Sequence, residues 1–427
     1  MISKKTFKIG GVVIPENKTS TNIPIKNAGI PETIFINTKL DNNTNYKILI
    51  KKGDLVKVGT LLIKNIEEEN IHSSVCGTIE NININKINDD YSETTITIRT
   101  KKDIFENDID LSNDINPEIT LSKEEIIEKI KKAGIVNINK FLNSAKLENI
   151  DTFIINGIEC EPYLTADERL ILEYAEEIVV GVKIINKILG IQNALIAIDE
   201  NKKAAIDVMQ RVCKRYVGVN IVICKNKYPQ GYEHQLVATI TEKELPIGKS
   251  ACDVGCFIQN VGDVFAVYEA VQKNKPMIEK IVTITGDATN NPANFKARIG
   301  TPVSFLYNQC GILDKEIEEV FIGDPMKGET IIDKNQPIGK TTSGIILLSK
   351  KSISKCQEND CIRCGKCADV CPMGLEPFAF SNLLEKNDIP EIRNSKVVNC
   401  IECGACSYIC PSKIPLTSFA KLLKEIK

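Results

Sequence analysis

Short apolar runs interrupted by glycines occupy the first hundred residues of the chain. β-Branched residues recur among polar ones over 47–63 and 72–82, and Gly53 and Gly59 punctuate the first of these runs. Runs of this length are typical of short strands joined by tight turns. The pattern predicts a small N-terminal β half-barrel over 1–100.

After this segment the pattern changes to an alternation of helices and strands. Ser122 and Glu125 form a capping box that starts a helix, and Gly134 can end it. Strands are then predicted over 152–156, 194–198 and 218–224, and helices over 166–189 and 202–216. Such alternation predicts an α/β domain with a largely parallel sheet over 121–272, joined to the half-barrel by a polar linker over 101–120.

Beyond residue 272 the elements become shorter. A strand over 281–285, a helix opened by Pro302 and a strand over 320–322 predict an α+β module of β-grasp size over 273–330. The remaining stretch, 331–427, is rich in cysteine. The predicted fold class is therefore multidomain α/β with a separate C-terminal domain.

Composition narrows the functions that such a chain can have. Of its 427 residues, 43% are hydrophobic and 26% are charged, as in a folded globular protein. The net charge of -2 argues against a nucleic acid partner, because phosphate binding requires an excess of basic residues. No signal-like segment begins the chain, and lysines and asparagines interrupt its most apolar stretch, 178–198. We expect a cytoplasmic protein without a transmembrane helix, attached to the inner face of a cell membrane, if at all, through a complex.

Eight of the 16 cysteines form two matching runs near the C-terminus. Each run has the spacing Cys-x2-Cys-x2-Cys-x3-Cys-Pro, which is the ferredoxin spacing for two [4Fe-4S] clusters. In that arrangement the fourth cysteine of each run ligates the cluster of the other run. The spacing predicts cluster I on Cys361, Cys364, Cys367 and Cys410, and cluster II on Cys371, Cys400, Cys403 and Cys406.

The residue types of the chain argue against a zinc site and against histidine-based catalysis. Zinc prefers two pairs of ligands around one ion, which this spacing does not supply. His72 and His234 are the only histidines, too few for a histidine-based zinc enzyme, and no catalytic residue is predicted. We interpret the other eight cysteines as bystanders, including Cys252 and Cys256 as core thiols and Cys356 as a spare thiol.

Several segments resemble the RnfC family, whose members belong to the Rnf electron-transport complex and are similar to the NADH-binding subunit of respiratory complex I. The resemblance includes IINGIECEPYLTAD at 154–167 and KYPQGYEHQL at 227–236, and with the half-barrel and the twin cysteine runs it covers nearly the whole chain in order. It implies a barrel-sandwich hybrid for the half-barrel and a complex I flavoprotein-like fold for the α/β domain. It also implies an SLBB-like β-grasp module and a ferredoxin-like α-helical domain at the C-terminus.

In that family electrons pass from NADH to FMN and then to the two clusters, and the family member is the cytoplasmic arm of an ion pump. The resemblance implies that Asn156, Glu161 and Asn260 face the flavin, and that Gly231 and Glu233 border the cofactor cleft. A polar loop after a parallel strand suits a ligand at the carboxyl edge of the sheet. The alternative, that the loop carboxylates are solvated surface charges, stays open.

Two segments depart from the family pattern. The family has a loop Gly-x-Gly-Gly-x-x-Phe-Pro-Thr-His-x-Lys after the first helix, whose backbone N–H groups cradle phosphate. Here 135–147 lacks those glycines, and Ile138 and Lys140 stand where a backbone must approach its ligand closely. At 322–328 the sequence Ile-Gly-Asp-Pro-Met-Lys-Gly adds charge to a family turn. The first departure counts against both an FMN site and an NADH site.

Three hypotheses of function follow. The first is an electron-transfer subunit of an Rnf-type ion-translocating ferredoxin:NAD oxidoreductase, with two [4Fe-4S] clusters, other Rnf subunits as partners, and FMN and NADH as further ligands. The second is an electron-transfer protein of proline reductase, fed by another redox protein and without an NADH site. The third is a docking or assembly subunit whose flavin domain is inert.

Overall fold

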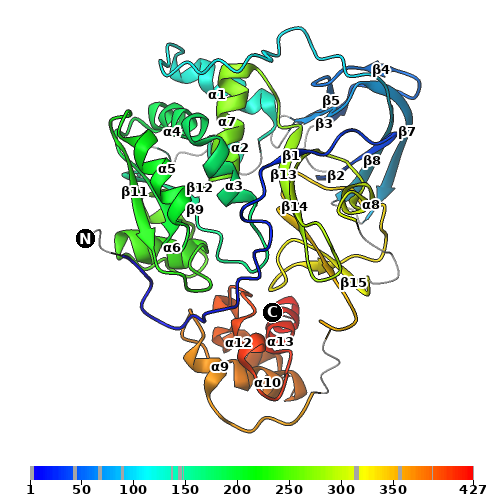
Figure 1. Ribbon diagram of the computed structural model, residues 1–427. Coiled ribbons are helices and arrows are strands. Elements are labelled where there is room, and N and C mark those ends of the chain that lie inside the picture. The colour runs from blue at the N-terminus through cyan, green and yellow to red at the C-terminus, as the bar shows by residue number, and fades with distance from the viewer. Residues whose placement is uncertain are drawn as a thin grey trace.

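Four structural units make up the molecule, and an N-terminal arm crosses three of them (Figure 1). The structure, a computed structural model, describes residues 4–41, 46–65, 70–87, 91–135, 138–142, 147, 149–311, 317–353, 358–386 and 388–426. Cys356 and parts of the segment 135–147 lie outside the described residues.

The first unit is the half-barrel, built from two small antiparallel sheets with the orders β2-β8-β7-β4 and β3-β5-β6. Its strands are β2 (Thr33–Asp41), β3 (Tyr46–Ile48), β4 (Leu55–Val56), β5 (Leu61–Asn65), β6 (Ile71–His72), β7 (Gly77–Lys86) and β8 (Tyr91–Thr100). Ile34, Ile96 and Ile98 are fully buried in its core. Because alternate residues of a strand face the same side, this spacing of isoleucines forms one apolar face. The predicted half-barrel is confirmed.

The second unit is the α/β unit, whose four parallel strands have the order β11-β10-β9-β12. The strands are β9 (Thr152–Gly157), β10 (Ala194–Asp199), β11 (Val219–Cys224) and β12 (Cys256–Asn260). The helices are α1 (Lys123–Ala133), α2 (Ile138–Leu142), α3 (Ala166–Glu173), α4 (Ala175–Leu189), α5 (Lys203–Cys213), α6 (Glu233–Thr241) and α7 (Val261–Lys273), with the 3₁₀ turn η2 (Ala251–Val254). The capping box of Ser122 and Glu125 starts α1, and Gly134 ends it in the left-handed conformation, as predicted.

The predicted helix over 166–189 is wrong, because the structure has two helices there. Tyr174 leaves the helical region, with φ of -131°. Its N–H donates to Leu170 at the end of α3, while its carbonyl accepts from Ile178 in α4. The end of α3 and the start of α4 thus both form backbone hydrogen bonds with Tyr174. The apolar periodicity continues across the break, so the sequence pattern does not show it. The helix predicted over 202–216 is also shorter, since α5 ends at Cys213.

The third unit is a mixed sheet with the order β1-β14-β13-β17-β15-β16. Its elements are β1 (Lys26–Asn27), β13 (Glu279–Thr285), β14 (Ala293–Arg298), α8 (Val303–Asn308), β15 (Glu319–Ile322), β16 (Glu329–Thr330) and β17 (Gly344–Leu348). Val303 and Leu306 of α8 pack into one core with Val282 of β13. Strands β1 and β17 come from beyond the predicted 273–330 segment. The sequence did not predict them, because pairing between distant strands leaves no mark in a local pattern.

The fourth unit is helical and holds both cysteine runs, in 358–426 (orange to red in Figure 1). Its elements are α9 (Lys366–Asp369), η4 (Pro377–Ala379), α10 (Phe380–Lys386), α11 (Ile389–Asn394), η5 (Lys396–Asn399), α12 (Ala405–Ile409) and α13 (Leu416–Ile426). Ile392, Ala420 and Leu423 are fully buried in its core. Across the described ranges, no helix combines the length and the apolar character that a membrane crossing requires.

The N-terminal arm, residues 4–25, runs past the α/β unit and the helical unit before it reaches β1 (Figure 1). The Lys5 N–H donates to a carbonyl of β11 at 2.9 Å, and the Gly11 N–H donates to the Val370 carbonyl at 2.8 Å. The Glu16 carbonyl then accepts from the loop after β9 at 2.7 Å. The arm therefore holds the helical unit against the α/β unit.

Candidate functional site

The two cysteine runs follow the same backbone course. Arg363 and Glu402 have φ of 56° and 55°, and Gly365 and Gly404 have φ of 76° and 81°. Each glycine is the N-cap of a short helix, α9 in the first run and α12 in the second. Left-handed conformations favour glycine, which explains its place directly after the second cysteine of each run. The repeat in the sequence is thus a repeat in the structure.

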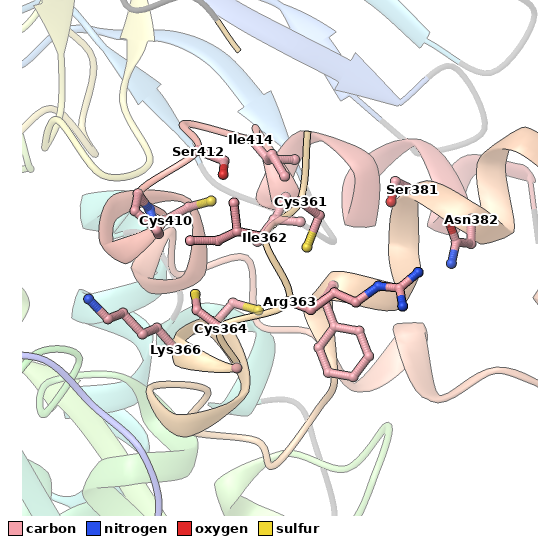
Figure 2. Close-up of a pocket in the computed structure, with 15 residues that line it drawn as sticks. Cys361, Ile362, Arg363, Cys364, Lys366, Ser381, Asn382, Cys410, Ser412 and Ile414 are labelled. Atoms are coloured by element: carbon pink, nitrogen blue, oxygen red, sulfur yellow. The ribbon is translucent and has the colours of Figure 1, made fainter. Parts of the chain in front are cut away.

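The first cavity of the helical unit has a volume of about 560 Å³ and lies under the loop of the first run (Figure 2). Cys361 and Cys364 are exposed at its mouth, while Cys367 and Cys410 are buried. Three of these thiols come from the first run and the fourth comes from the second run, at the end of α12. The lining therefore includes all four residues predicted for cluster I: Cys361, Cys364, Cys367 and Cys410.

The second cavity is smaller and holds the complementary set of thiols. Its lining includes all four residues predicted for cluster II: Cys371, Cys400, Cys403 and Cys406. The Leu375 N–H donates to the Cys371 Sγ at 3.3 Å, and the Glu402 N–H donates to the Cys400 Sγ at 3.4 Å. Hydrogen bonds to ligand sulfur stabilise the more negative, reduced form of a cluster and raise its reduction potential.

The donor chemistry fits cubane clusters rather than single ions. In the described part of the chain, no three His, Cys, Asp or Glu side chains converge on a point where one metal ion could sit. Each thiolate of a cubane binds its own iron, so four thiols need only surround a common volume. Burial raises the pKa of Cys403 to about 12, so cluster assembly must displace a proton from this thiol.

Tyr228 of the α/β unit contacts the backbone of the cluster II ligand Cys403 and pairs with Tyr232, contacts that the sequence did not predict. The Tyr228 hydroxyl donates to the Cys403 carbonyl at 2.6 Å and lies 2.7 Å from the Tyr232 hydroxyl. The Lys327 Nζ lies 3.7 Å from the centroid of the Tyr232 ring. Both tyrosines fall within the 227–236 segment, but their direction toward Cys403 depends on how two distant units pack. These contacts fix the helical unit against the α/β unit.

The residues predicted to face a flavin lie at the carboxyl edge of the parallel sheet. Asn156 and Asn260, at the ends of β9 and β12, are joined by a hydrogen bond of 3.1 Å, and Asn156 also donates to the Gly231 carbonyl at 2.9 Å. Asn156, Asn260 and Glu161 line a cavity of about 210 Å³. Glu233 instead accepts a hydrogen bond of 2.6 Å from the backbone of η2. The structure therefore gathers four of the five predicted residues and gives Glu233 a structural partner.

Buried ion pairs fix the loop that carries Glu161. The Lys202 Nζ lies 2.9 Å from carboxylate oxygens of both Glu159 and Glu168, and all three side chains are at most 7% exposed. Asp199 accepts the Glu159 N–H at 3.0 Å, and Lys18 of the arm donates to the Glu159 carbonyl at 2.8 Å. Glu159 is therefore a structural ion, and the interpretation of this carboxylate as a solvated surface charge is wrong.

The cleft is acidic. Five carboxyl groups and two ammonium groups line it. Burial and the nearby Asp324 raise the pKa of Glu161 to about 8, and burial and Glu159 raise the pKa of Asp167 to about 7. These shifts mean that the cleft already disfavours ionisation of its own acids. A phosphate group placed there would add negative charge where negative charge is least stable.

The described part of the segment that replaces the glycine-rich family loop, helix α2, packs away from this cleft. Ile138 of α2 is 1% exposed within the apolar core, and Phe141 packs edge to face on Phe257 with ring centroids 5.5 Å apart. Phe257 stands near the amino end of β12, while Asn260 ends the same strand at the cleft. As far as the structure describes it, α2 contributes no residue to the cleft lining. In the described residues this cavity is acid-lined and smaller than the usual ~300 Å³ of ligand sites, which is unfavourable for the phosphate of FMN.

Comparison with known proteins settles the family. Three family models match the chain: the RnfC barrel sandwich hybrid domain over 5–103, the Nuo51 FMN-binding domain over 130–269 and the 4Fe-4S dicluster domain over 355–414. The subunit designated C in the proton-translocating ferredoxin:NAD+ oxidoreductase complex of Clostridium ljungdahlii is 36% identical over 400 residues, which cover 90% of this chain and 85% of that protein. The chain belongs to the RnfC family.

Further relatives agree with this membership. The subunit designated C in the Na+-translocating ferredoxin:NAD+ oxidoreductase complex of Acetobacterium woodii is 34% identical over 399 residues, 90% of this RnfC-type chain and 88% of that protein. A solved structure of NAD+-reducing [NiFe]-hydrogenase in the H2-reduced state aligns with a TM-score of 0.50 and 12% identity, over 71% of this chain and 60% of that chain. The latter likeness shows the fold alone. With the dicluster match, the predicted pair of [4Fe-4S] clusters is confirmed.

Proposed function

We propose that this chain is the RnfC-type electron-transfer subunit of an ion-translocating ferredoxin:NAD oxidoreductase complex. It carries electrons through its two [4Fe-4S] clusters and attaches to the membrane through other subunits of that complex. The observation that carries this proposal is the pair of adjacent cavities, each lined by four cysteines. Two relatives that cover most of the chain are subunits of such complexes.

The crossed ligand sets are part of the proposal. Cluster I is held by Cys361, Cys364, Cys367 and Cys410, and cluster II by Cys371, Cys400, Cys403 and Cys406. Each set lines its own cavity, and each draws one thiol from the other run. Because each cluster takes one thiol from the other run, the two clusters lie close together, as a relay of single electrons requires.

The proposed path contains no flavin of this chain. The acidic, narrow cleft and the apolar packing of α2 support this choice. The same observations favour a second candidate, an electron carrier fed by a protein rather than by NADH, as in the proline reductase hypothesis. In both, electrons arrive from and leave to other redox proteins, one electron per cluster at a time.

Reduction of anaerobically purified full chain tests this function. Dithionite is expected to bleach the visible absorbance of the clusters, NADH is expected to leave it unchanged, and acid extraction is expected to release far less than one flavin per chain. Stoichiometric FMN together with bleaching by NADH would contradict the flavin-free path while leaving the electron-transfer function intact. Absorbance that dithionite does not change would contradict the function itself.

The finer fold divisions are proposals as well. We assign the half-barrel to 1–100, the linker to 101–120 and the flavoprotein-like α/β domain to 121–272. The β-grasp, SLBB-like module begins at 273, and we extend it from 330 to Leu348. The extension rests on β17, which pairs with both β13 and β15.

A further inference from the structure

The two cluster cavities differ in how they meet solvent. Around cluster I, Cys361 and Cys364 are exposed, and the intervening Ile362 is 67% exposed. Around cluster II none of the four thiols is exposed, since Cys371 and Cys403 are buried and Cys400 and Cys406 are half-buried. An electron that passes between two proteins must cross the gap between their centres, and the rate falls steeply as that gap widens. Cluster I is therefore the better point of contact with another redox protein.

Cluster II is covered by the rest of this chain. The Tyr228 hydroxyl reaches the Cys403 carbonyl from the α/β unit, and the Met326 carbonyl of the mixed sheet lies against Gly404. The arm approaches so closely that a side chain at Gly10 would lie 2.4 Å from the Cys371 carbonyl oxygen. No comparable cover is present over cluster I in the ranges that the structure describes, since its lining residues all belong to 361–416.

The lining of the cluster I cavity combines positive charge with apolar surface. Arg363 and Lys366 are the charged residues among the described lining, and Figure 2 shows their side chains extending in opposite directions from the cysteine loop. Ile362 and Phe378, which is 40% exposed, supply apolar contact area beside the thiols. We name this set, Ile362, Arg363, Lys366 and Phe378, the cluster I face.

We propose that the cluster I face is the docking site for a redox protein that presents an acidic surface over its own metal centre. The inference rests on the proposed electron-transfer function and adds the partner's chemistry and the point of contact. Opposite charges around the two centres would steer the encounter and orient the partner, while Ile362 and Phe378 exclude water from the contact. One electron then crosses: the donor centre is oxidised by one electron, the acceptor is reduced by one, and no bond or proton moves.

Charge reversal at the face tests the proposal in the full, iron-loaded chain. The variant Arg363→Glu/Lys366→Glu is compared with Arg393→Glu/Lys396→Glu, a pair of exposed cations with the same spacing that does not line the cavity. Each protein is reduced with dithionite, freed of excess reductant and mixed in a stopped-flow instrument with oxidised rubredoxin, a small acidic iron protein. A neutral quinone serves as the oxidant without a charged surface.

At low salt the face variant is expected to reduce rubredoxin about 10-fold more slowly than wild type, and the control pair is expected to match wild type. In about 1 M salt, where charges are screened beyond about 3 Å, the difference should vanish. The rate with the quinone should not change.

A face variant that reduces rubredoxin as fast as wild type, or faster, would overturn the acidic-partner proposal. Equal slowing with the quinone would also overturn it, because the two cations would then tune the cluster rather than the docking. Wild type that dithionite cannot reduce would instead overturn the proposed function.

Discussion

Cys371 shows how a single residue can belong to one run of the sequence and to the opposite cavity of the structure. It follows Cys367 by one turn, yet α9 turns the chain so that its thiol joins Cys400, Cys403 and Cys406. Cys410 makes the reciprocal move into the first cavity. The crossing follows from the short helix after each glycine, which places the fourth cysteine on the far side of its own loop.

Removing one crossing thiol is therefore expected to damage the cluster of the other run. Cys371→Ala should perturb the EPR signal of the cluster held by Cys400, Cys403 and Cys406, and Cys410→Ala should perturb the other signal. Cys310→Ala, which removes a fully buried thiol of the mixed sheet, is the control and should leave both signals unchanged. Damage by Cys371→Ala that is confined to the first cluster would contradict the crossed assignment.

Glu161 is a residue whose ionisation opposes folding. Its pKa is raised from 4.5 to about 8 by burial and by Asp324. Between these two pH values the folded state binds more protons than the unfolded state. The free energy of unfolding therefore falls as the pH rises. The effect is absent below the unfolded pKa, where both states are protonated.

Glu161→Gln is accordingly expected to raise the melting temperature at about pH 8.5 and to leave it nearly unchanged at about pH 4.5. Relief of even about 1 kcal/mol corresponds to about 2 to 4 °C for a domain of roughly 150 to 250 residues. Thermal denaturation at the two pH values measures the difference, with exposed Glu124→Gln as the control. An equal effect of Glu161→Gln at both pH values would show that the carboxyl does not titrate in this window.

At the scale of elements, the sequence predicted those features that local chemistry determines. The capping box and Gly134 set both ends of α1, and the alternation of apolar strands and helices indicated the parallel sheet. The break at Tyr174 was missed because hydrogen bonds satisfy both helices there. β1 and β17 were missed because strand pairing over long separations has no local pattern.

The role of the N-terminal arm depends on the close contact between Gly10 and the backbone of Cys371. Gly10 and Gly29 have similar positive φ values of 65° and 71°, so alanine strains the backbone equally at both. An added Cβ at Gly10 would clash with the backbone of Cys371, whereas nothing lies within 4 Å of a Cβ at Gly29. The pair separates backbone strain from the contact with the helical unit.

Gly29→Ala is expected to cost about 1 to 2 kcal/mol from left-handed strain alone. Gly10→Ala should cost about 1 to 3 kcal/mol more, because the arm must withdraw from cluster II. Thermal denaturation of the two variants measures the difference, and the EPR signal of cluster II should change in Gly10→Ala alone. Equal destabilisation with unchanged EPR signals would mean that the arm does not support the cluster.

At the scale of the whole molecule, the sequence predicted the two clusters but not the features that form where separate units pack together. The cysteine spacing predicted both clusters, because thiolates at that spacing leave few other possibilities. The acidic cleft, the tyrosines beside Cys403 and the exposed cluster I face came from packing between units, which no segment of the sequence encodes by itself. Cluster II is the enclosed site of the pair and cluster I is the exposed one.

Iron and sulfide analysis combined with EPR of the dithionite-reduced full chain tests the central claim most directly. The account predicts about eight iron and eight sulfide ions per chain, four of each for each cluster, and the spectrum of two neighbouring, magnetically interacting [4Fe-4S] clusters. Four iron ions with the spectrum of one isolated cluster, or zinc in place of iron, would contradict it.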